Sequence, residues 1–527
     1  MLFLAGAAAG QESGVGGIVA NFAGAKSFKD VEAIIDALGE SGDPAAVLSL
    51  HSLSDGTLMV RESDGHVLIV EGKGAALALR DPVTGDTVDT AGATSDDFAK
   101  IKIKNSLRRR IDAALSGLTL SAKSRDVRLT AARTIFDRPD AGAVAALDAA
   151  LESETDLQVR EAFLDARAAA LLSGDGVPDR KIEAVERIAK RGDRAALALL
   201  LRNSGTAEGE LKTAIDAGIA DVEADLAAWA AAQNVWYGIS LGSVLLLAAI
   251  GLAITFGVMG VINMAHGEMV MLGAYTTFAI QELIRNSAPG LFDYSLLFAV
   301  PAAFVISGGT GFLMERGLIR HLYGRPLETL LATWGVSLIL QQAVRTIFGP
   351  TNREVGNPSW MSGAFEVGQV AITWNRLWIV VFALAVFAAL YLIVNRSPAG
   401  LQMRAVTQNR RMAGAMGIKT SWVDAMTFAL GSGIAGIAGV ALSQIDNVSP
   451  NLGQSYIIDS FLVVVFGGVG NLWGTLVGAM TLGVANKFLE PYAGAVLGKI
   501  LVLVLIILFI QKRPRGLFAL KGRAVES

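Results

Sequence analysis

The chain of 527 residues has no cysteine and only four histidines. Without cysteine there can be no disulfide bond, no cysteine-ligated metal site and no cysteine nucleophile. The formal net charge of −3 argues against a nucleic-acid partner, because proteins that bind nucleic acid present a clustered basic surface.

A nucleotide-binding loop is also missing. The segment from Gly494 to Lys499 superficially resembles one, but it has one residue too few between its glycines. Ile500 stands where the motif requires Ser or Thr, and the segment opens an apolar run. We therefore expect a chain that is no enzyme, holds no cofactor or metal, and depends on another subunit for energy.

Long charge-poor segments are confined to the chain after residue 235 or so, whereas the earlier residues are rich in alanine and in charged side chains. This contrast predicts a soluble part joined to a membrane part. Residues 1–10 are apolar and end in small residues, which is typical of the end of a secretory signal. The alternative for this segment is a frayed terminus.

The first region of the soluble part, residues 11–99, is predicted to be a small α+β region. Apolar periodicity within 28–53 indicates two short helices. Two β-hairpins should follow, because short apolar runs flank polar turns at Gly65 and at Gly85.

The second region, residues 100–234, contains paired amphipathic helices. Their spacing of roughly 30–40 residues is typical of a HEAT-like helical solenoid, and an irregular helical domain is the alternative. We find no nucleophile, paired carboxylate or metal-ligand pattern in this sequence, and we expect His51 and His66 to be surface residues.

Residues 235–527 are expected to form an all-α polytopic membrane domain with about eight or nine hydrophobic segments, since a span needs about 20 mostly apolar residues. Residues 456–486, between the last two spans, are predicted to form two shorter apolar pieces separated by glycines. These pieces either cross the membrane or form one re-entrant hairpin. The remaining spans are 236–259, 267–284, 295–314, 327–347, 376–395, 422–443 and 494–511.

Basic residues indicate how this domain is oriented. The loops after the third and fifth spans and the C-terminal segment are richer in Lys and Arg than the loops on the opposite side. The richer side normally faces the cytoplasm, so we expect a cytoplasmic C-terminus. An odd number of crossings then places the N-terminal domain outside, in agreement with the signal-like start.

Several motifs in the membrane part resemble the permeases of branched-chain amino-acid ABC importers, and the resemblance covers essentially all of 235–520. The long N-terminal extension, together with Asn447–Gly453 and Trp360–Gly363, resembles the urea permease branch of that family. The motifs shared with the whole family are Gly251–Glu268, Met271–Tyr275, Ala332–Leu340, Ser397–Ile418, Phe466–Thr475 and Arg513–Phe518.

The resemblance implies a multi-pass permease of a bacterial inner membrane with a periplasmic N-terminal domain. It implies that the chain imports urea with a second homologous permease, two cytoplasmic ATPase subunits and a periplasmic solute-binding protein. One alternative is a permease for branched-chain amino acids or short amides. Others are an uncoupled urea channel and, from a different class, a membrane-anchored extracytoplasmic scaffold or receptor.

The loop at 396–418 is polar and basic but carries embedded apolar residues. It resembles the cytoplasmic coupling loop of the family, so we expect short helices that press into a groove on the ATPase. The alternative is a solvated loop whose charges only set the topology. The expected contact residues are Leu401, Met403, Arg404, Ala405, Val406, Asn409, Met412 and Met416.

Polar residues within the apolar segments are the candidate substrate contacts. Thr333, Ser337 and Gln341 recur every four residues and therefore share one helix face, beside Trp334. Planar, neutral urea suits hydroxyl and amide groups with a flat apolar wall, whereas an amino acid needs a charged clamp. Hydrogen bonding between helices and helix capping are the alternative roles. The other candidates are Asn263, His266, Glu268 and Asn471.

Overall fold

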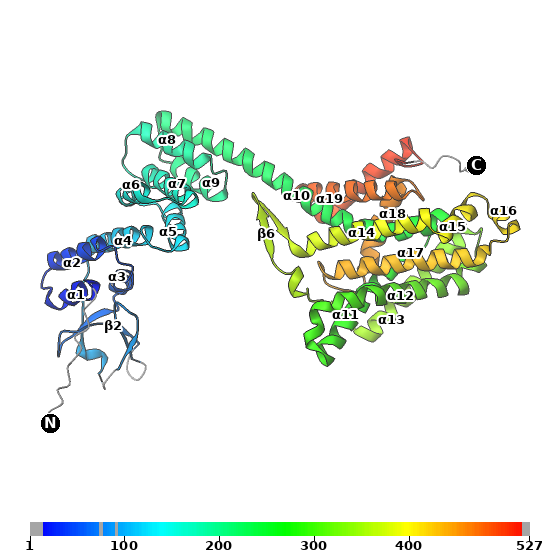
Figure 1. Ribbon diagram of the computed structural model, residues 1–527. Helices are drawn as coiled ribbons and strands as arrows, with labels where there is room; N and C mark the ends of the chain where they lie inside the picture. Colours follow the sequence, from blue (N-terminus) through cyan, green and yellow to red (C-terminus); the bar gives the residue numbers. More distant parts are fainter. Residues whose placement is uncertain (1–13, 73–76, 90–92, 519–527) are drawn as a thin grey trace, which may run out of the picture. The chain divides into compact units, whose positions relative to one another are not determined.

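The computed structural model describes residues 14–72, 77–89 and 93–518. The signal-like residues 1–10 therefore lie outside the described part of the chain. The chain divides into two compact units, Met1–Ala227 and Ala228–Ser527, and each is described by itself (Figure 1).

Unit 1 begins with three short helices and a five-stranded antiparallel sheet of order β4-β3-β2-β1-β5. The predicted hairpins are confirmed, because β1 pairs with β2 and β3 pairs with β4. The helices are α1 (Gly14–Ala20), α2 (Phe28–Glu40) and α3 (Ala46–Asp55). The strands are β1 (Leu58–Arg61), β2 (Val67–Glu71), β3 (Ala78–Arg80), β4 (Thr87–Val88) and β5 (Phe98–Lys100).

Six further helices complete the part of unit 1 that precedes the long helix α10. They are α4 (Asn105–Leu120), α5 (Arg125–Asp137), α6 (Ala143–Ser153), α7 (Leu157–Ser173), α8 (Pro178–Ala189) and α9 (Arg194–Ser204). The predicted helices are confirmed, while their assignment to a HEAT-like solenoid stays a prediction.

A buried ion pair and an N-cap fix the start of α7. Arg128 on α5 donates to Glu154 Oε2 at 2.6 Å, and the Glu154 side chain is only 5 % exposed. Burial alone would raise the pKa of Glu154, but hydrogen bonds from Asp156 N and from Arg128 outweigh burial and lower it. Asp156 caps α7 by accepting from the backbone N–H groups of Gln158 and Val159.

Unit 2 is helical apart from one small hairpin. Its helices are α10 (Gly209–Met259, which begins in unit 1), α11 (His266–Ser287), α12 (Ser295–Gly317), α13 (Pro326–Phe348) and α14 (Trp374–Arg396). They continue with α15 (Pro398–Gln408), α16 (Arg410–Ala415), α17 (Thr420–Ser443), α18 (Leu452–Gly467) and α19 (Leu472–Lys512). The hairpin, which sequence analysis missed, consists of β6 (Ala364–Val367) and β7 (Val370–Thr373).

Within the described residues, five helical segments are long and apolar enough to cross a membrane. They are α10, Pro289–His321 with α12, α14, α17 and α19. A polytopic membrane unit is therefore supported. The predicted spans that correspond to α11 and α13 are of similar length but more polar, and their crossing stays a prediction.

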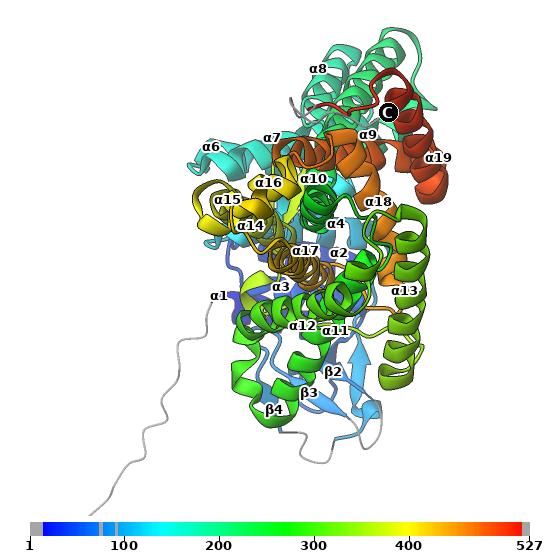
Figure 2. The ribbon, with the colours of Figure 1, turned by 90° about the vertical axis from the view of Figure 1, so that its right-hand side faces the viewer.

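Helix α17 forms the centre of unit 2, with α10 on one side and α11 and α12 on another (Figure 2). Glycines make this packing possible, because a Cβ on Gly273 of α11 would lie 1.9 Å from the Gly436 carbonyl oxygen of α17. Gly251 of α10 meets Gly431 of α17 in the same way. Small residues at such crossings allow membrane helices to approach closely.

Helix α19 is interrupted at Gly494, whose φ of 75° lies in the left-handed region. Gly498 then packs against Leu489, so the chain turns back on itself there. The predicted glycine break between α18 and α19 is confirmed, since Gly468 and Gly470 both have positive φ. Whether these pieces cross the membrane fully stays a prediction.

Candidate functional site

A polar stripe on α13 faces the interior of unit 2. Thr333, Ser337 and Gln341 are 0–4 % exposed, as their four-residue spacing predicts. The opposite surface of α13 is apolar and open, for example at Leu331 and Ile339, which are 64 % and 67 % exposed. Helix α13 therefore contacts the rest of the chain through its polar side.

The carboxylate of Glu268 is the centre of this polar contact. Ser337 Oγ and Gln341 Nε2 donate to Glu268 Oε1 at 2.9 and 2.8 Å, and Gln341 Nε2 lies 3.2 Å from Ser337 Oγ. Glu268 itself is 1 % exposed. All three residues were predicted candidates. Their contact could not be predicted from spacing, because Glu268 is separated from Ser337 by 69 residues and from Gln341 by 73.

The second oxygen of this carboxylate, Oε2, has no hydrogen-bond partner. It faces the start of α18, where a Cβ on Gly453 would come within 2.8 Å of it. Gly267 and Gly453 bring the two backbones together, since a Cβ on Gly267 would meet the Gly453 carbonyl oxygen at 2.3 Å. A buried acceptor without a donor is costly, so Oε2 is the position in this cluster at which a donor is missing.

The irregular segment between α10 and α11 forms another side of the cluster. Thr333 Oγ1 accepts from Met264 N at 3.1 Å, and Asn263 Oδ1 accepts from Ala265 N at 3.0 Å. His266 Nε2 lies 2.9 Å from the Ala248 carbonyl oxygen, so this nitrogen carries the proton. Asn263 Nδ2 and His266 Nδ1 are buried without partners.

Two of the expected substrate residues lie elsewhere. Trp334, which was expected to form an apolar wall beside the stripe, is 49 % exposed, because adjacent helical residues point about 100° apart, and its role stays a prediction. Asn471 caps α19 by accepting from Gly474 N at 3.1 Å, and its Nδ2 donates to the Phe518 carbonyl oxygen. It is a capping residue at the α18–α19 break and does not join the Glu268 cluster.

Arg345 and Asn451 were not among the predicted site residues. Arg345 continues the stripe of α13 by one more four-residue step, and this spacing could have revealed it. Its Nη2 donates to Asn451 Oδ1 at 2.6 Å. A cationic side chain therefore lies one helical turn beyond Gln341, on the same face as the Glu268 contacts.

The coupling loop folds into α15 and α16, and the eight expected contact residues divide into an exposed set, a buried set and three others. Leu401, Met412 and Met416 are 60–77 % exposed, so their apolar side chains are open to a partner. Met403 and Val406 are only 5 % and 4 % exposed and pack with Val423 of α17, so they cannot press into a partner as expected. A short helix such as α15 must bury one face against its own chain, and its mixture of polar and apolar residues does not show which face.

Of the remaining three expected contact residues, Arg404 and Asn409 stabilise the loop through hydrogen bonds. Arg404 Nη1 donates to the Val394 carbonyl oxygen at 2.6 Å and so satisfies the end of α14. Asn409 caps α16 by accepting from Met412 N at 3.0 Å. Ala405 is half-buried.

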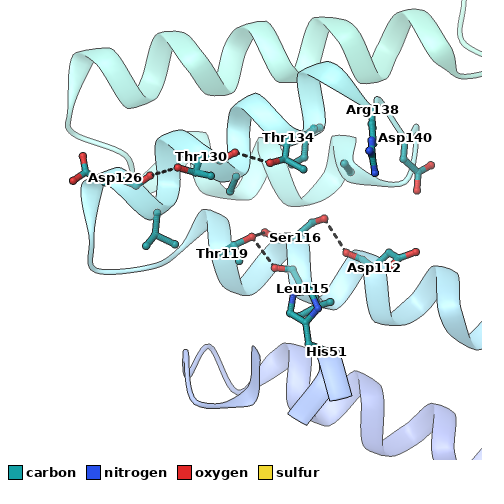
Figure 3. Close-up of a pocket in the computed structure, with 14 residues that line it drawn as sticks. His51, Asp112, Leu115, Ser116, Thr119, Asp126, Thr130, Thr134, Arg138 and Asp140 are labelled. Atoms are coloured by element: carbon teal, nitrogen blue, oxygen red, sulfur yellow. Dashed lines mark hydrogen bonds between the residues drawn. The ribbon is translucent and has the colours of Figure 1, made fainter. Parts of the chain in front are cut away.

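Unit 1 has a groove of about 710 Å³ lined by residues of α3, α4 and α5 (Figure 3). Its hydroxyl groups donate to carbonyl oxygens of their own helices, as in Thr130 to Asp126 O and Ser116 to Asp112 O. His51, at the rim, is an exposed surface residue, and His66 is exposed as well. The described residues hold no cluster of His, Asp or Glu suited to a metal.

Comparison with known proteins defines the class of unit 2. The family model described as branched-chain amino acid transport system / permease component matches residues 234–510. The permease protein BraD of Pseudomonas aeruginosa is 30 % identical over 292 residues, which are 54 % of this chain and 94 % of that protein. The permease protein LivH of Escherichia coli K12 is 33 % identical over 296 residues, with the same shares of 54 % and 94 %.

A more distant relative is the probable permease protein LivH of Methanocaldococcus jannaschii, which is 25 % identical over 293 residues and is covered to 88 %. No solved structure matches. The chain belongs to the branched-chain amino acid transport permease family and is the permease component of an ABC transporter. Residues 1–233 lie outside the family match.

Proposed function

We propose that the chain is one of two permeases of an ABC importer for urea. The observation that carries the proposal is the buried Glu268 carboxylate, with two donors on Oε1 and none on Oε2. The resemblance of the long N-terminal extension to the urea permease branch supports the choice of urea.

The chemistry of urea complements these unpaired atoms. Urea has four N–H donors and one carbonyl acceptor, and it carries no charge. One of its amide groups would supply the donor that Glu268 Oε2 lacks. Its carbonyl group would accept from a side-chain amide such as the unpaired Nδ2 of Asn263 or the Nε2 of Gln341.

Substrate passage would require α13 to move. The Glu268 cluster is almost completely buried, with exposed fractions of 1–4 % for Glu268, Ser337 and Gln341. Hydrogen bonds to Glu268 and apolar contacts such as that of Tyr275 with Phe348 join α11 and α13, and a solute that replaces the hydrogen bonds would weaken this contact. Alternating access, in which a site opens to each side of the membrane in turn, would then deliver the solute.

Branched-chain amino acids are the second candidate substrate. Arg345 continues the stripe of α13, and Glu268 of α11 faces that stripe, so the two provide one positive and one negative side chain. Such a pair could hold a carboxylate and an ammonium group, which is the charged clamp that an amino acid needs. The names of BraD and LivH, which describe branched-chain amino acid transport, favour this candidate too.

The partners and the orientation belong to the same proposal. The second permease, two ATPase subunits and a periplasmic solute-binding protein would complete the importer in an inner membrane. The exposed apolar surface of Leu401, Met412 and Met416 would bind the ATPase. The distribution of basic residues supports a cytoplasmic coupling loop and an N-terminal unit on the opposite side.

Uptake in cells tests the substrate. Cells with and without the gene would be given labelled urea or labelled leucine at micromolar concentration. The proposal expects urea uptake to fall on deletion, to return on complementation, and to resist competition by excess leucine. Loss of leucine uptake with unchanged urea uptake would reject urea and support the second candidate.

A further inference from the structure

Four charged or polar side chains meet where the coupling loop joins the membrane helices. Arg410, the first residue of α16, binds both carboxylate oxygens of Asp424 on α17, with Nη1 3.2 Å from Oδ1. The guanidinium carbon of Arg410 lies 4.9 Å from the ring centroid of Tyr323. Tyr323 Oη donates to Glu315 Oε1 on α12 at 3.0 Å. We call Glu315, Tyr323, Arg410 and Asp424 the loop cluster.

Arg410 is the main compensating cation of the loop cluster. The side chains of Asp424 and Glu315 are 0 % and 1 % exposed, whereas that of Arg410 is 43 % exposed. Arg316 also approaches Glu315, at 3.9 Å, but no side chain other than Arg410 is paired with Asp424 in the described part of the chain. Removing the partner of a buried carboxylate strongly destabilises the folded protein. The Arg410–Asp424 pair therefore resists separation of α16 from α17.

Tyr323 connects this pair to the candidate substrate site. It lies three positions before Pro326, where α13 begins, and α13 carries Ser337 and Gln341. Burial raises the pKa of Tyr323, and the nearby Asp424 and Glu315 carboxylates raise it further, so the phenol keeps its proton and remains a donor. A side chain of the coupling loop thus contacts the turn that leads into the helix bearing the polar stripe.

We propose that the loop cluster links the ATPase-docking loop to α13, with Arg410 as a positioning residue that transmits displacement of α16 to the turn before α13. The inference rests on the proposed function as an ATP-driven permease. The contact has to be rigid for a displacement of α16 to reach the turn before α13. The bidentate geometry of Arg410 provides such a contact.

The test uses the complete importer in proteoliposomes and measures two rates, solute uptake and ATP hydrolysis. The main variant is the double substitution Arg410→Gln with Asp424→Asn, which removes the ion pair without leaving one charge buried alone. Arg411→Gln is the matched control, because Arg411 is the next residue of α16, is exposed and carries the same charge. We expect the double variant to bind the ATPase and hydrolyse ATP, while the solute moved per ATP falls at least about fivefold, the lower end of typical coupling effects.

The second variant, Tyr323→Phe, keeps the ion pair and the docking surface but removes the donor to Glu315. We expect a smaller fall in the solute moved per ATP, and this variant decides the question if the double variant does not assemble. A wild-type ratio in Tyr323→Phe, or an equal fall in Arg411→Gln, would overturn the link. A wild-type importer without coupled uptake would instead reject the proposed function, so the two failures are distinguishable.

Discussion

At the scale of single residues, Glu268 is the side chain on which the polar interior of unit 2 converges. Its Oε1 already accepts from Ser337 and Gln341, while Oε2 faces Gly453 without a donor. Because the hydrogen bonds come from α13 and the carboxylate belongs to α11, separation of the two helices would break these hydrogen bonds.

Substitution of Gln341 tests this assignment. Gln341→Leu removes a donor to a charged acceptor, an interaction of about 1.5–3 kcal/mol, so we expect substrate uptake at low concentration to fall about tenfold or more. Gln342→Leu is the matched control, because Gln342 is the adjacent residue and is exposed. Equal uptake by the two variants, at equal amounts in the membrane, would remove Gln341 from the site.

The polar stripe of α13 could be predicted from sequence because helical periodicity alone puts Thr333, Ser337 and Gln341 on one face. The same geometry turns Trp334 away from this face, and it is 49 % exposed. The hydrogen bonds between Glu268 and α13 could not be predicted from the sequence, because they depend on the packing of helices that are distant in sequence.

At the scale of elements, two features of unit 2 stand out: the close glycine contacts between its helices, and the two short helices of the coupling loop, α15 and α16. The break in α18–α19 was predictable, since glycines interrupt an apolar run. The division of α15 and α16 into a buried and an exposed face was not, because both faces carry apolar residues. Val406 was predicted to contact the ATPase but is buried against α17, whereas Leu401 is 62 % exposed.

The exposed face of the coupling helices should carry the ATPase contact. Leu401→Asp puts a charge on this face without disturbing the buried Met403 and Val406. We expect the variant to reach the membrane in normal amounts but to co-purify with the ATPase at one tenth or so of the wild-type level, as for loss of a buried interface anchor. Leu157→Asp in unit 1 is the control, since Leu157 is 78 % exposed. Normal ATPase recovery with Leu401→Asp would exclude this face.

The crossing of α11 and α17 should tolerate no side chain. Gly273→Ala would place a carbon 1.9 Å from the Gly436 carbonyl oxygen, so the helices have to move apart. Overpacking of this kind costs about 1–3 kcal/mol, and we expect a lower melting temperature in detergent. Gly309→Ala on α12 meets nothing within 4 Å and serves as the control. A similar melting temperature for both variants would contradict the observed crossing.

At the scale of the whole molecule, the chain joins a family permease to a unit that the family match does not cover. The first residues of the permease unit have their own contacts: Gln233 exchanges two hydrogen bonds with Ala371 of β7, at 3.1 and 2.8 Å. Trp229 lies against Gly368 in the same hairpin. A truncation that is meant to test unit 1 should therefore keep both residues.

We propose that unit 1 docks a partner or assists assembly of the importer, and its removal tests this role. In a chain that starts at Ala228, we expect the importer to assemble poorly or to lose most of its uptake, because a contact surface for a partner would be missing. A chain that starts at Asn105 removes only the sheet region and separates its contribution from that of the helical region. Full uptake and normal complex recovery in the shorter chain would rule out both roles.

The most direct measurement is the accumulation of labelled urea by the purified importer in proteoliposomes that contain ATP. We expect urea to accumulate above its outside concentration only with ATP and the solute-binding protein, and excess leucine to leave the rate unchanged. We also expect Glu268→Gln, which removes the charged acceptor, to lower the rate about tenfold or more. Accumulation of leucine but not urea, or normal accumulation with Glu268→Gln, would contradict this function and this site.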